Sequence, residues 1–229
     1  MVAIPLPTAP PALRGDAADL CAPFVTALHV SGASISVFDA DGNQSTICST
    51  NRTAARGEAL QFELGEGPHW EALQLSAPVL CPDLAAEGWA KWPMFGAAAL
   101  EIGMAAVYAF PMKMGAVSVG VVDLYSAVPR RLDEHQIALA ASMANRTAAP
   151  AARHATNSAN SPLTSEHELA PALRREVHQA TGMVQAQLDV SATEAFARLR
   201  AHSYTSGRPI EDIAREVVAR LIDFSAFTD

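Results

Sequence analysis

The clearest candidates for chemistry lie along one side of a helix expected after residue 166. Arg175, Gln179 and Gly182 follow one another at intervals of four and three residues, which places them on a single helical stripe. A glycine inside a helix costs about 1 kcal/mol relative to alanine. Gly182 therefore suggests that another molecule approaches the backbone closely, although an ordinary solvated face would also fit.

A second candidate surface lies on the next helix along the chain. Arg200 and Tyr204 are four residues apart and share a side of that helix. An arginine beside an aromatic ring can hold an unstacked RNA base, and the alternative is an arginine that packs over its neighbour. Between Arg174 and Arg208, five arginines face three acidic residues, a local charge of +2.

Enzyme chemistry finds less support in the residue pattern. The sequence lacks a nucleophile elbow, a Walker loop and an H-E-x-x-H motif, and Gly65-Glu-Gly67 is not a phosphate loop. We expect a structural role for His69 and no enzymatic activity. Cys21, Cys48 and Cys81 are expected to fill partly buried positions, because three cysteines without a C-x-x-C pair form neither a zinc finger nor a disulfide framework.

Composition sets the broad class of the protein. Half of the 229 residues are hydrophobic and 17% are charged, which indicates folded domains, and the length favours two of them. No stretch approaches the roughly 18 apolar residues of a membrane span, and the proline-rich start lacks the basic region of a signal peptide. We therefore expect a cytoplasmic protein without a membrane partner. The net charge of −8 requires any nucleic-acid binding to use a local patch.

Before residue 147 the sequence mixes helical and extended patterns. The alternation at 33–38, the turn residues at 39–43 and the return at 44–49 predict a β-hairpin. Further elements are expected as helices at 16–28, 68–75, 93–102 and 132–147, and as strands at 78–80, 105–112 and 117–125. This order favours an antiparallel sheet packed against helices.

After residue 165 every pattern is helical. The expected core stripe of the first helix consists of Leu169, Leu173, Val177, Ala180, Val184 and Leu188. Ser191 to Glu194 form a capping box that begins a second helix, Gly207 ends it, and Pro209 begins a third. The stretch 150–165 is poor in large apolar residues and rich in Ala, Ser, Asn and Pro, and is the expected linker.

Two segments resemble known families. RREVHQATGMV and SATEAFARLRAHSYTSGRPIEDIAREVV, within 174–218, resemble the ANTAR domain. GEGPHWEAL, APVLCPDL, the Trp92-Pro93 pair and YAFPMKMGAVSVGVVDLY resemble the GAF domain. A cysteine often follows the Gly-Glu-Gly-Pro motif in similar GAF sequences, and His69 stands there in this chain, which puts thiol sensing at this position in doubt.

The resemblance implies a fold and a domain order. It implies an α+β, GAF-like antiparallel sheet with flanking helices, followed by an all-α three-helix bundle. The expected domains are a disordered tail at 1–14, a GAF-like sensor at 15–149, a linker at 150–165 and an ANTAR bundle at 166–229. Ala180, Leu199, Ile213 and Ala214 match the ANTAR motif, but their place on the apolar stripes predicts core positions.

The resemblance also implies a function. ANTAR domains bind paired RNA hairpins in nascent transcripts, usually as dimers, and so prevent terminator formation under the control of an attached sensor. The implied RNA-binding residues are Arg175, Gln179, Gly182, Met183, Arg200, Ser203, Tyr204 and Arg208. A small-molecule ligand is expected in the GAF part, but neither it nor any cofactor or metal can be read from the sequence. We expect the helix at 132–147 to pack partly against a second copy, because its apolar residues exceed the need of one sheet face.

Three alternatives remain open on the residues alone. The bundle could dock on a partner helix as a protein-interaction module. DNA binding is disfavoured, because Ala192, Thr193 and Glu194 at the start of the second helix suit a major groove poorly. A redox enzyme on the GAF scaffold, like the free methionine sulfoxide reductases, would need two reactive cysteines close in space.

Overall fold

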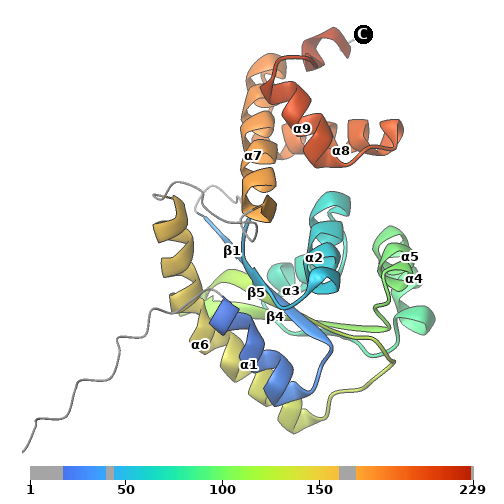
Figure 1. Ribbon diagram of the computed structural model, residues 1–229, viewed down its shortest axis with the longest axis vertical. Helices are drawn as coiled ribbons and strands as arrows, with labels where there is room; N and C mark the ends of the chain where they lie inside the picture. The colour runs from blue at the N-terminus through green and yellow to red at the C-terminus, as the bar shows by residue number, and fades with distance from the viewer. Residues whose placement is uncertain (1–17, 40–43, 160–168, 228–229) are drawn as a thin grey trace, which may run out of the picture.

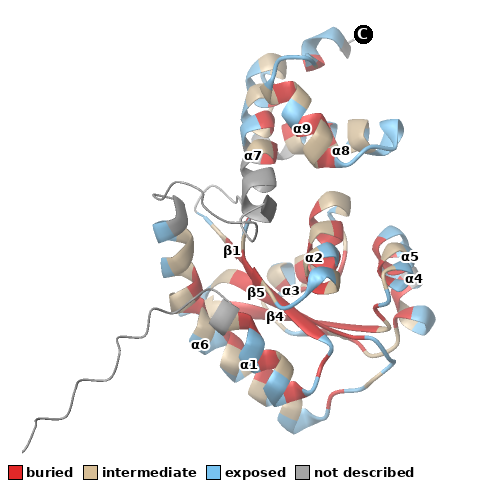
Figure 2. Ribbon diagram, viewed as in Figure 1, coloured by how far each residue is buried: buried red, intermediate tan, exposed pale blue. Residues whose placement is uncertain are grey.

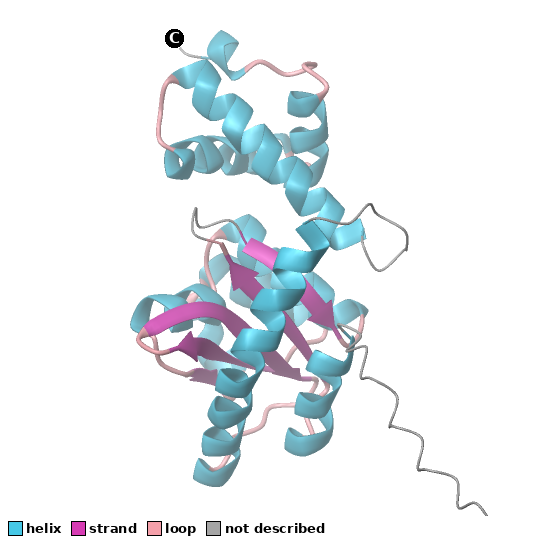
Figure 3. Ribbon diagram, turned by 90° about the vertical axis from the view of Figure 1, so that its left-hand side faces the viewer, coloured by secondary structure: helices cyan, strands magenta, loops and turns pink. Residues whose placement is uncertain are grey.

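The computed structural model describes residues 18–39, 44–159 and 169–227 (Figure 1). The expected tail at 1–14 and most of the expected turn at 39–43 lie outside the described residues. Two parts follow one another along the chain, a sheet covered by helices and a smaller helical bundle above one end of it (Figures 1 and 3).

The first part is built on a five-stranded antiparallel sheet in the order β2-β1-β5-β4-β3. Its strands are β1 (Gly32–Phe38), β2 (Gln44–Ser49), β3 (Val79–Cys81), β4 (Ala106–Met114) and β5 (Val117–Ser126). In the centre, Ile35 of β1 lies opposite Val122 of β5, which in turn lies opposite Phe110 of β4. The strands and both hairpins expected from the sequence are confirmed.

Helices cover both faces of the sheet (Figure 1). One face carries α1 (Ala18–Leu28) and α6 (Glu134–Ala159), which cross in front of the strands in Figure 3. The other face carries α2 (Arg52–Leu64), α3 (Pro68–Leu75), the π-turn η1 (Leu84–Gly88), α4 (Trp89–Lys91) and α5 (Pro93–Glu101). A separate apolar cluster fills the space on each face, and the sheet between them is buried (Figure 2).

Strand alternation gives the two sheet faces different chemistry. Ala33, Ile35 and Val37 of β1 point into the core beneath α1 and α6. The intervening Ser34 and Ser36 are also buried, so they face the side covered by α2 and α3. Polar side chains are therefore built into that second interior.

The structure differs from the sequence expectation at two helices. Helix α2 was not expected, although Asn51 caps its first turn by accepting the Ala54 N–H at 2.9 Å and Gly65 ends it in the left-handed region at φ 63°. Helix α6 runs on to Ala159, so residues 150–159 of the expected linker are helical. Proline lacks a backbone N–H and so removes one helical hydrogen bond at Pro150. Alanine is the best helix former, and the alanines around Pro150 favour continuation of the helix. Residues 160–165 lie outside the described residues.

The second part is a bundle of α7 (Leu169–Leu188), α8 (Ala192–Ser206) and α9 (Ile210–Val218), followed by the 3₁₀ turn η3 (Phe224–Phe227). Ser191 caps α8 by accepting the Glu194 N–H, and Gly207 ends it at φ 65°, as expected. Among the motif residues predicted to be core, four have no exposed surface: Ala180, Leu199, Ile213 and Ala214.

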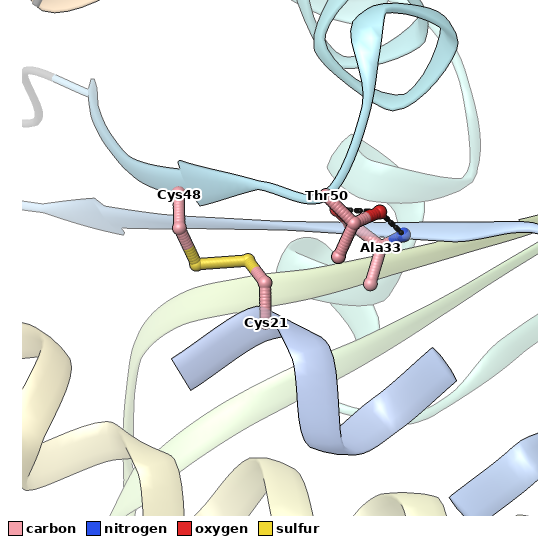
Figure 4. The surroundings of a disulfide bond; sticks show 4 residues. All are labelled: Cys21, Ala33, Cys48 and Thr50. Carbon is pink, nitrogen blue, oxygen red and sulfur yellow. Dashed lines mark hydrogen bonds between the residues drawn. A yellow bond between two sulfur atoms is a disulfide. The ribbon is translucent and has the colours of Figure 1, made fainter. Parts of the chain in front are cut away.

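Two of the three cysteines form a disulfide bond, which corrects the expectation that they merely fill positions (Figure 4). Cys21 of α1 joins Cys48 of β2, with 6.1 Å between their Cα atoms, while Cys81 is buried and unbonded. The bond ties the edge strand to the helix that covers it. A separation of 27 residues gives no local pattern from which to predict the pairing.

Candidate functional site

The predicted stripe on α7 lies at the surface of the bundle. Gln179 and Gly182 are exposed, and a Cβ added to Gly182 would meet no described atom within 4 Å. Open space thus lies beside this glycine, and no neighbour in the described chain requires its small size. Met183 is only partly exposed and packs against the bundle core. Arg175 belongs to α7, but its side chain lies outside the described residues.

The two contact residues predicted on α8, Arg200 and Tyr204, differ in exposure and do not pair with each other. Tyr204 is 73% exposed and stands clear of the core. Arg200 is half-buried, and its guanidinium carbon lies 5.4 Å from the centroid of the Phe196 ring, one turn earlier. Burial lowers the pKa of Arg200. The aromatic partner of this arginine is therefore Phe196, and Tyr204 offers a free ring beyond it.

The turn after α8 brings two further predicted residues together. The Ser203 hydroxyl donates a hydrogen bond of 2.6 Å to the Arg208 carbonyl oxygen. The Arg208 guanidinium donates to both carboxylate oxygens of Glu216 on α9, at 2.7 and 3.0 Å. This pairing lowers the pKa of Glu216 and raises that of Arg208. The Arg208 guanidinium is thus paired with the Glu216 carboxylate in the protein without RNA.

The remaining ion pairs of the bundle dilute its positive charge. Arg198 lies 3.2 Å from Glu194, and Arg215 contacts Glu176 and Asp212 at 3.3 and 3.0 Å. These exposed pairs leave a mixed surface with no broad basic patch over the described part of the bundle. RNA recognition by this surface would rely on a few well-placed groups.

Part of the predicted surface contacts the first domain. The end of α2 lies beneath α8 (Figure 1), and Phe62 of α2 belongs to the core cluster of the bundle. The Phe62 and Phe196 rings are 5.1 Å apart. A Cβ added to Gly65 would lie 1.5 Å from Nη1 of Arg200. Arg200 therefore rests against the α2 terminus, a contact that helical periodicity within each segment could not predict.

A small cavity of about 20 Å³, room for about one water molecule, lies between the sheet and helices α2, α3 and α5. Its polar lining includes Glu58 and Gln61 of α2 and Asp123 of β5. Glu58 is buried and accepts hydrogen bonds from Gln44 at 2.6 Å and from Thr46 at 3.2 Å. The residue pattern did not identify this site, and the one signal that could have done so is Asp123, a charged residue inside the strand β5.

His69 links the cavity wall to α3. Its side chain is 1% exposed, and Nδ1 lies 2.7 Å from Oδ2 of Asp123. Its backbone N–H donates to the Gln61 side chain at 2.8 Å. The other Asp123 oxygen, Oδ1, is buried without a hydrogen-bond partner among the described residues. A carboxylate oxygen left in this state can accept a hydrogen bond from a bound donor.

The Gly-Glu-Gly-Pro motif organises the surrounding helices. Gly65 ends α2, and the Glu66 carboxylate accepts the Phe95 N–H at 2.6 Å in the first turn of α5. Gly67 adopts φ 129° where a Cβ would lie 2.6 Å from the Gln61 side chain, and Pro68 begins α3. These roles are structural, and they place Gln61 between the cavity and the α2 terminus.

Comparison with protein families identifies both parts. The GAF domain model matches residues 16–149, and the ANTAR domain model matches residues 168–218. The chain belongs to the GAF family and carries an ANTAR domain after it, the arrangement of a GAF–ANTAR regulator. Both domain types are regulatory and non-catalytic. Together they define a signal-responsive, RNA-binding regulator of transcription antitermination.

Solved structures resemble the first part at low sequence identity. The GAF domain of the cyanobacteriochrome TePixJ is 18% identical with a TM-score of 0.48, covering 63% of this chain and 93% of that one. GAF3 from Slr1393 of Synechocystis sp. PCC6803 is 15% identical with a TM-score of 0.47, covering 66% and 100%. The type II free methionine-R-sulfoxide reductase of Thermoplasma acidophilum is 14% identical with a TM-score of 0.38, covering 53% and 78%. No curated protein matches the chain.

The described residues lack two further features. They hold no helix long and apolar enough to cross a membrane. They also hold no cluster of three or more histidine, cysteine or acidic side chains that could bind a metal ion.

Proposed function

We propose that this regulator binds two successive hairpins in a nascent transcript through the exposed side of α7 and α8. The observation that carries the proposal is the exposed set of Gln179, Gly182 and Tyr204 on the side away from the bundle core. Tyr204 provides a face for a base in a hairpin loop, and Gly182 leaves room for a backbone to approach. The proposed set also includes Arg200, Ser203 and Arg208 from α8 and the turn after it, and Arg175 and Met183 from α7.

We propose that two copies act together, because two hairpins require two bundles. Supporting residues lie on α6, where Ile137, Leu139 and Met143 are only partly covered by the sheet. Light scattering of the purified protein at micromolar concentration, with and without RNA, measures the assembly. We expect a dimer in at least the RNA-bound sample, and a monomer in both would contradict the proposal.

We propose that the signal is a small molecule that widens the cavity on binding and donates a hydrogen bond to Oδ1 of Asp123. The buried, unpartnered oxygen and the neighbouring Gln61 amide support a polar ligand with at least one N–H or O–H donor. Thermal-shift screening of donor-rich metabolites against the wild type and Asp123→Leu tests this proposal. A stabilising compound should lose its effect in the variant, which keeps the branching at Cγ but removes the acceptor.

The position of the disulfide does not favour the redox-enzyme alternative. Cys21 and Cys48 belong to the cluster under α1 and α6, whereas the cavity lies on the opposite face of the sheet. A substrate in the cavity would be separated from both sulfur atoms by the sheet itself.

The RNA proposal is tested by binding across a salt series. The full-length protein should bind a tandem-hairpin RNA more tightly than a single hairpin or duplex DNA, with affinity falling as salt rises. Tyr204→Ala should weaken binding by about tenfold, the scale of one lost stacking contact. Leu221→Ala is its matched control, because Leu221 is 76% exposed and lies outside the proposed surface. Equal affinity for all three nucleic acids would contradict the proposal.

A further inference from the structure

The bundle completes its core with a residue from the sensor domain. Phe62 is 5% exposed and clusters with buried residues of α7, α8 and α9. Trp70 of α3 packs against the same cluster. An aromatic residue at the end of a surface helix would be exposed if the bundle moved away. The two domains are therefore joined by an apolar contact in addition to the chain between them.

Arg200 lies at the edge of this apolar contact. Its guanidinium stacks on Phe196 and fills the space that a side chain at Gly65 would need. Its Nε is buried without a hydrogen-bond partner among the described residues. Burying a charged group without full hydrogen bonding is unfavourable. The burial of Arg200 in this contact therefore costs free energy, which the packing of its neighbours must offset. A phosphate group outside the contact would satisfy it better.

We propose that the GAF domain masks Arg200 and thereby holds the bundle in a closed, weakly RNA-binding state. In the closed state Phe62 and Gly65 occupy the side of α8 on which Arg200 lies, while Tyr204 stays exposed. RNA and the α2 terminus then compete for the same arginine, and opening of the contact raises RNA affinity. The proposal rests on RNA binding by the α7–α8 surface.

The cavity reaches this contact through Gln61. The Gln61 side chain lines the cavity and holds the His69 N–H, while its backbone carbonyl accepts the Gly65 N–H at 2.9 Å. Phe62 is the next residue along α2. A ligand that displaced the Gln61 side chain would act directly on the turn that holds Phe62 and Gly65 in place. The closed contact is therefore positioned to respond to cavity occupancy.

A single substitution on the sensor side can displace Arg200 from the contact. Gly65→Asn would place a Cβ on the Arg200 guanidinium, and asparagine tolerates the left-handed backbone better than other non-glycine residues. Gly115→Asn is the matched control, because Gly115 has φ 66° against 63° for Gly65 and has open space around it. Both variants carry the same backbone change, and only the first displaces Arg200.

Small-angle X-ray scattering and tandem-hairpin RNA binding are measured on the full-length proteins. We expect Gly65→Asn to increase the radius of gyration and to bind the RNA at least about fivefold more tightly than the wild type, with Gly115→Asn unchanged in both. If Gly65→Asn opens the protein but leaves the RNA affinity unchanged, masking is refuted while RNA binding stands. If it opens the protein and no variant binds RNA, the proposed function fails, and masking fails with it.

A second variant tests the proposal independently, in case Gly65→Asn does not fold. Phe62→Gln removes the aromatic contact from the sensor side and leaves every bundle residue intact. Leu75→Gln is its control, because Leu75 is 60% exposed at the end of α3. Phe62→Gln should reproduce the increase in radius and in affinity. A folded Phe62→Gln protein with wild-type radius and affinity would overturn the proposal.

Discussion

The indole Nε1 of Trp70 donates a hydrogen bond of 2.6 Å to the backbone carbonyl oxygen of Gln61. The Gln61 side chain lies in the cavity wall on one side of this bond, and the Trp70 ring packs against the helical bundle on the other. The bond therefore links the cavity wall to the contact between the GAF domain and the bundle. It is formed by neighbouring helices of one domain, so it does not depend on the linker.

Gln61→Ala should destabilise the protein. The change removes the acceptor of the buried His69 N–H, and an unsatisfied buried donor costs about 1–3 kcal/mol. Urea denaturation of the full-length protein measures the loss in the free energy of unfolding. Gln179→Ala is the control: Gln179 is exposed, so its unfolding free energy should change by less than about 0.5 kcal/mol. Equal stability of both variants would show that Gln61 is not required for packing.

Glu216→Gln should strengthen RNA binding, because it releases Arg208 from its carboxylate partner. We expect a gain of up to about fivefold, the scale of one exposed ion pair, and a salt dependence steeper by about one phosphate contact. Electrophoretic mobility shifts over a salt series measure both. Glu194→Gln is matched, since it adds the same charge and frees Arg198 outside the proposed site. An equal gain in both variants would assign the effect to net charge.

The same pair predicts a pH dependence of stability. Arg208 holds the pKa of Glu216 below its ordinary value of 4.5. A carboxylate with a lowered folded pKa stabilises the protein above its unfolded pKa, and this contribution is lost as the pH falls through the folded value. The difference in unfolding free energy between wild type and Glu216→Gln should thus be present at pH 7 and shrink as the pH falls below 4.5. A difference that stayed constant across this range would exclude the ion pair as its source.

Local signals predicted most of the architecture. Alternation marked β1, and the capping box at Ser191 and the left-handed Gly207 marked the limits of α8, because these features act within a few residues. Helix α2 was missed although Asn51 and Gly65 bound it. Its interior holds Gly57, whose added Cβ would lie 2.1 Å from Met104, so tertiary packing favours the glycine against its helix propensity.

The contacts that couple the site could not be predicted in the same way. Residue spacing identified Arg200 as a surface candidate, but its burial depends on Gly65, which lies 135 positions earlier in the chain. Phe62 similarly reads as one apolar residue at the end of a helix, and nothing local assigns it to the bundle. Contacts between domains depend on shape and placement, which periodicity within a segment does not encode.

Reduction of the disulfide should lower stability without destroying the fold. The bond between Cys21 and Cys48 closes a long loop in the unfolded chain, and its loss should cost about 2–4 kcal/mol. Both residues also contribute to the apolar cluster beneath α1, which remains after reduction. Urea denaturation with and without dithiothreitol measures the difference. The Cys21→Ser/Cys48→Ser double variant should be insensitive to the reductant, since Cys81 is unbonded. If the unfolding midpoint of the wild type did not move on reduction, the bond would make no contribution to stability, and the remaining contacts of β2, among them the hydrogen bonds from Gln44 and Thr46 to Glu58, would hold the strand in place.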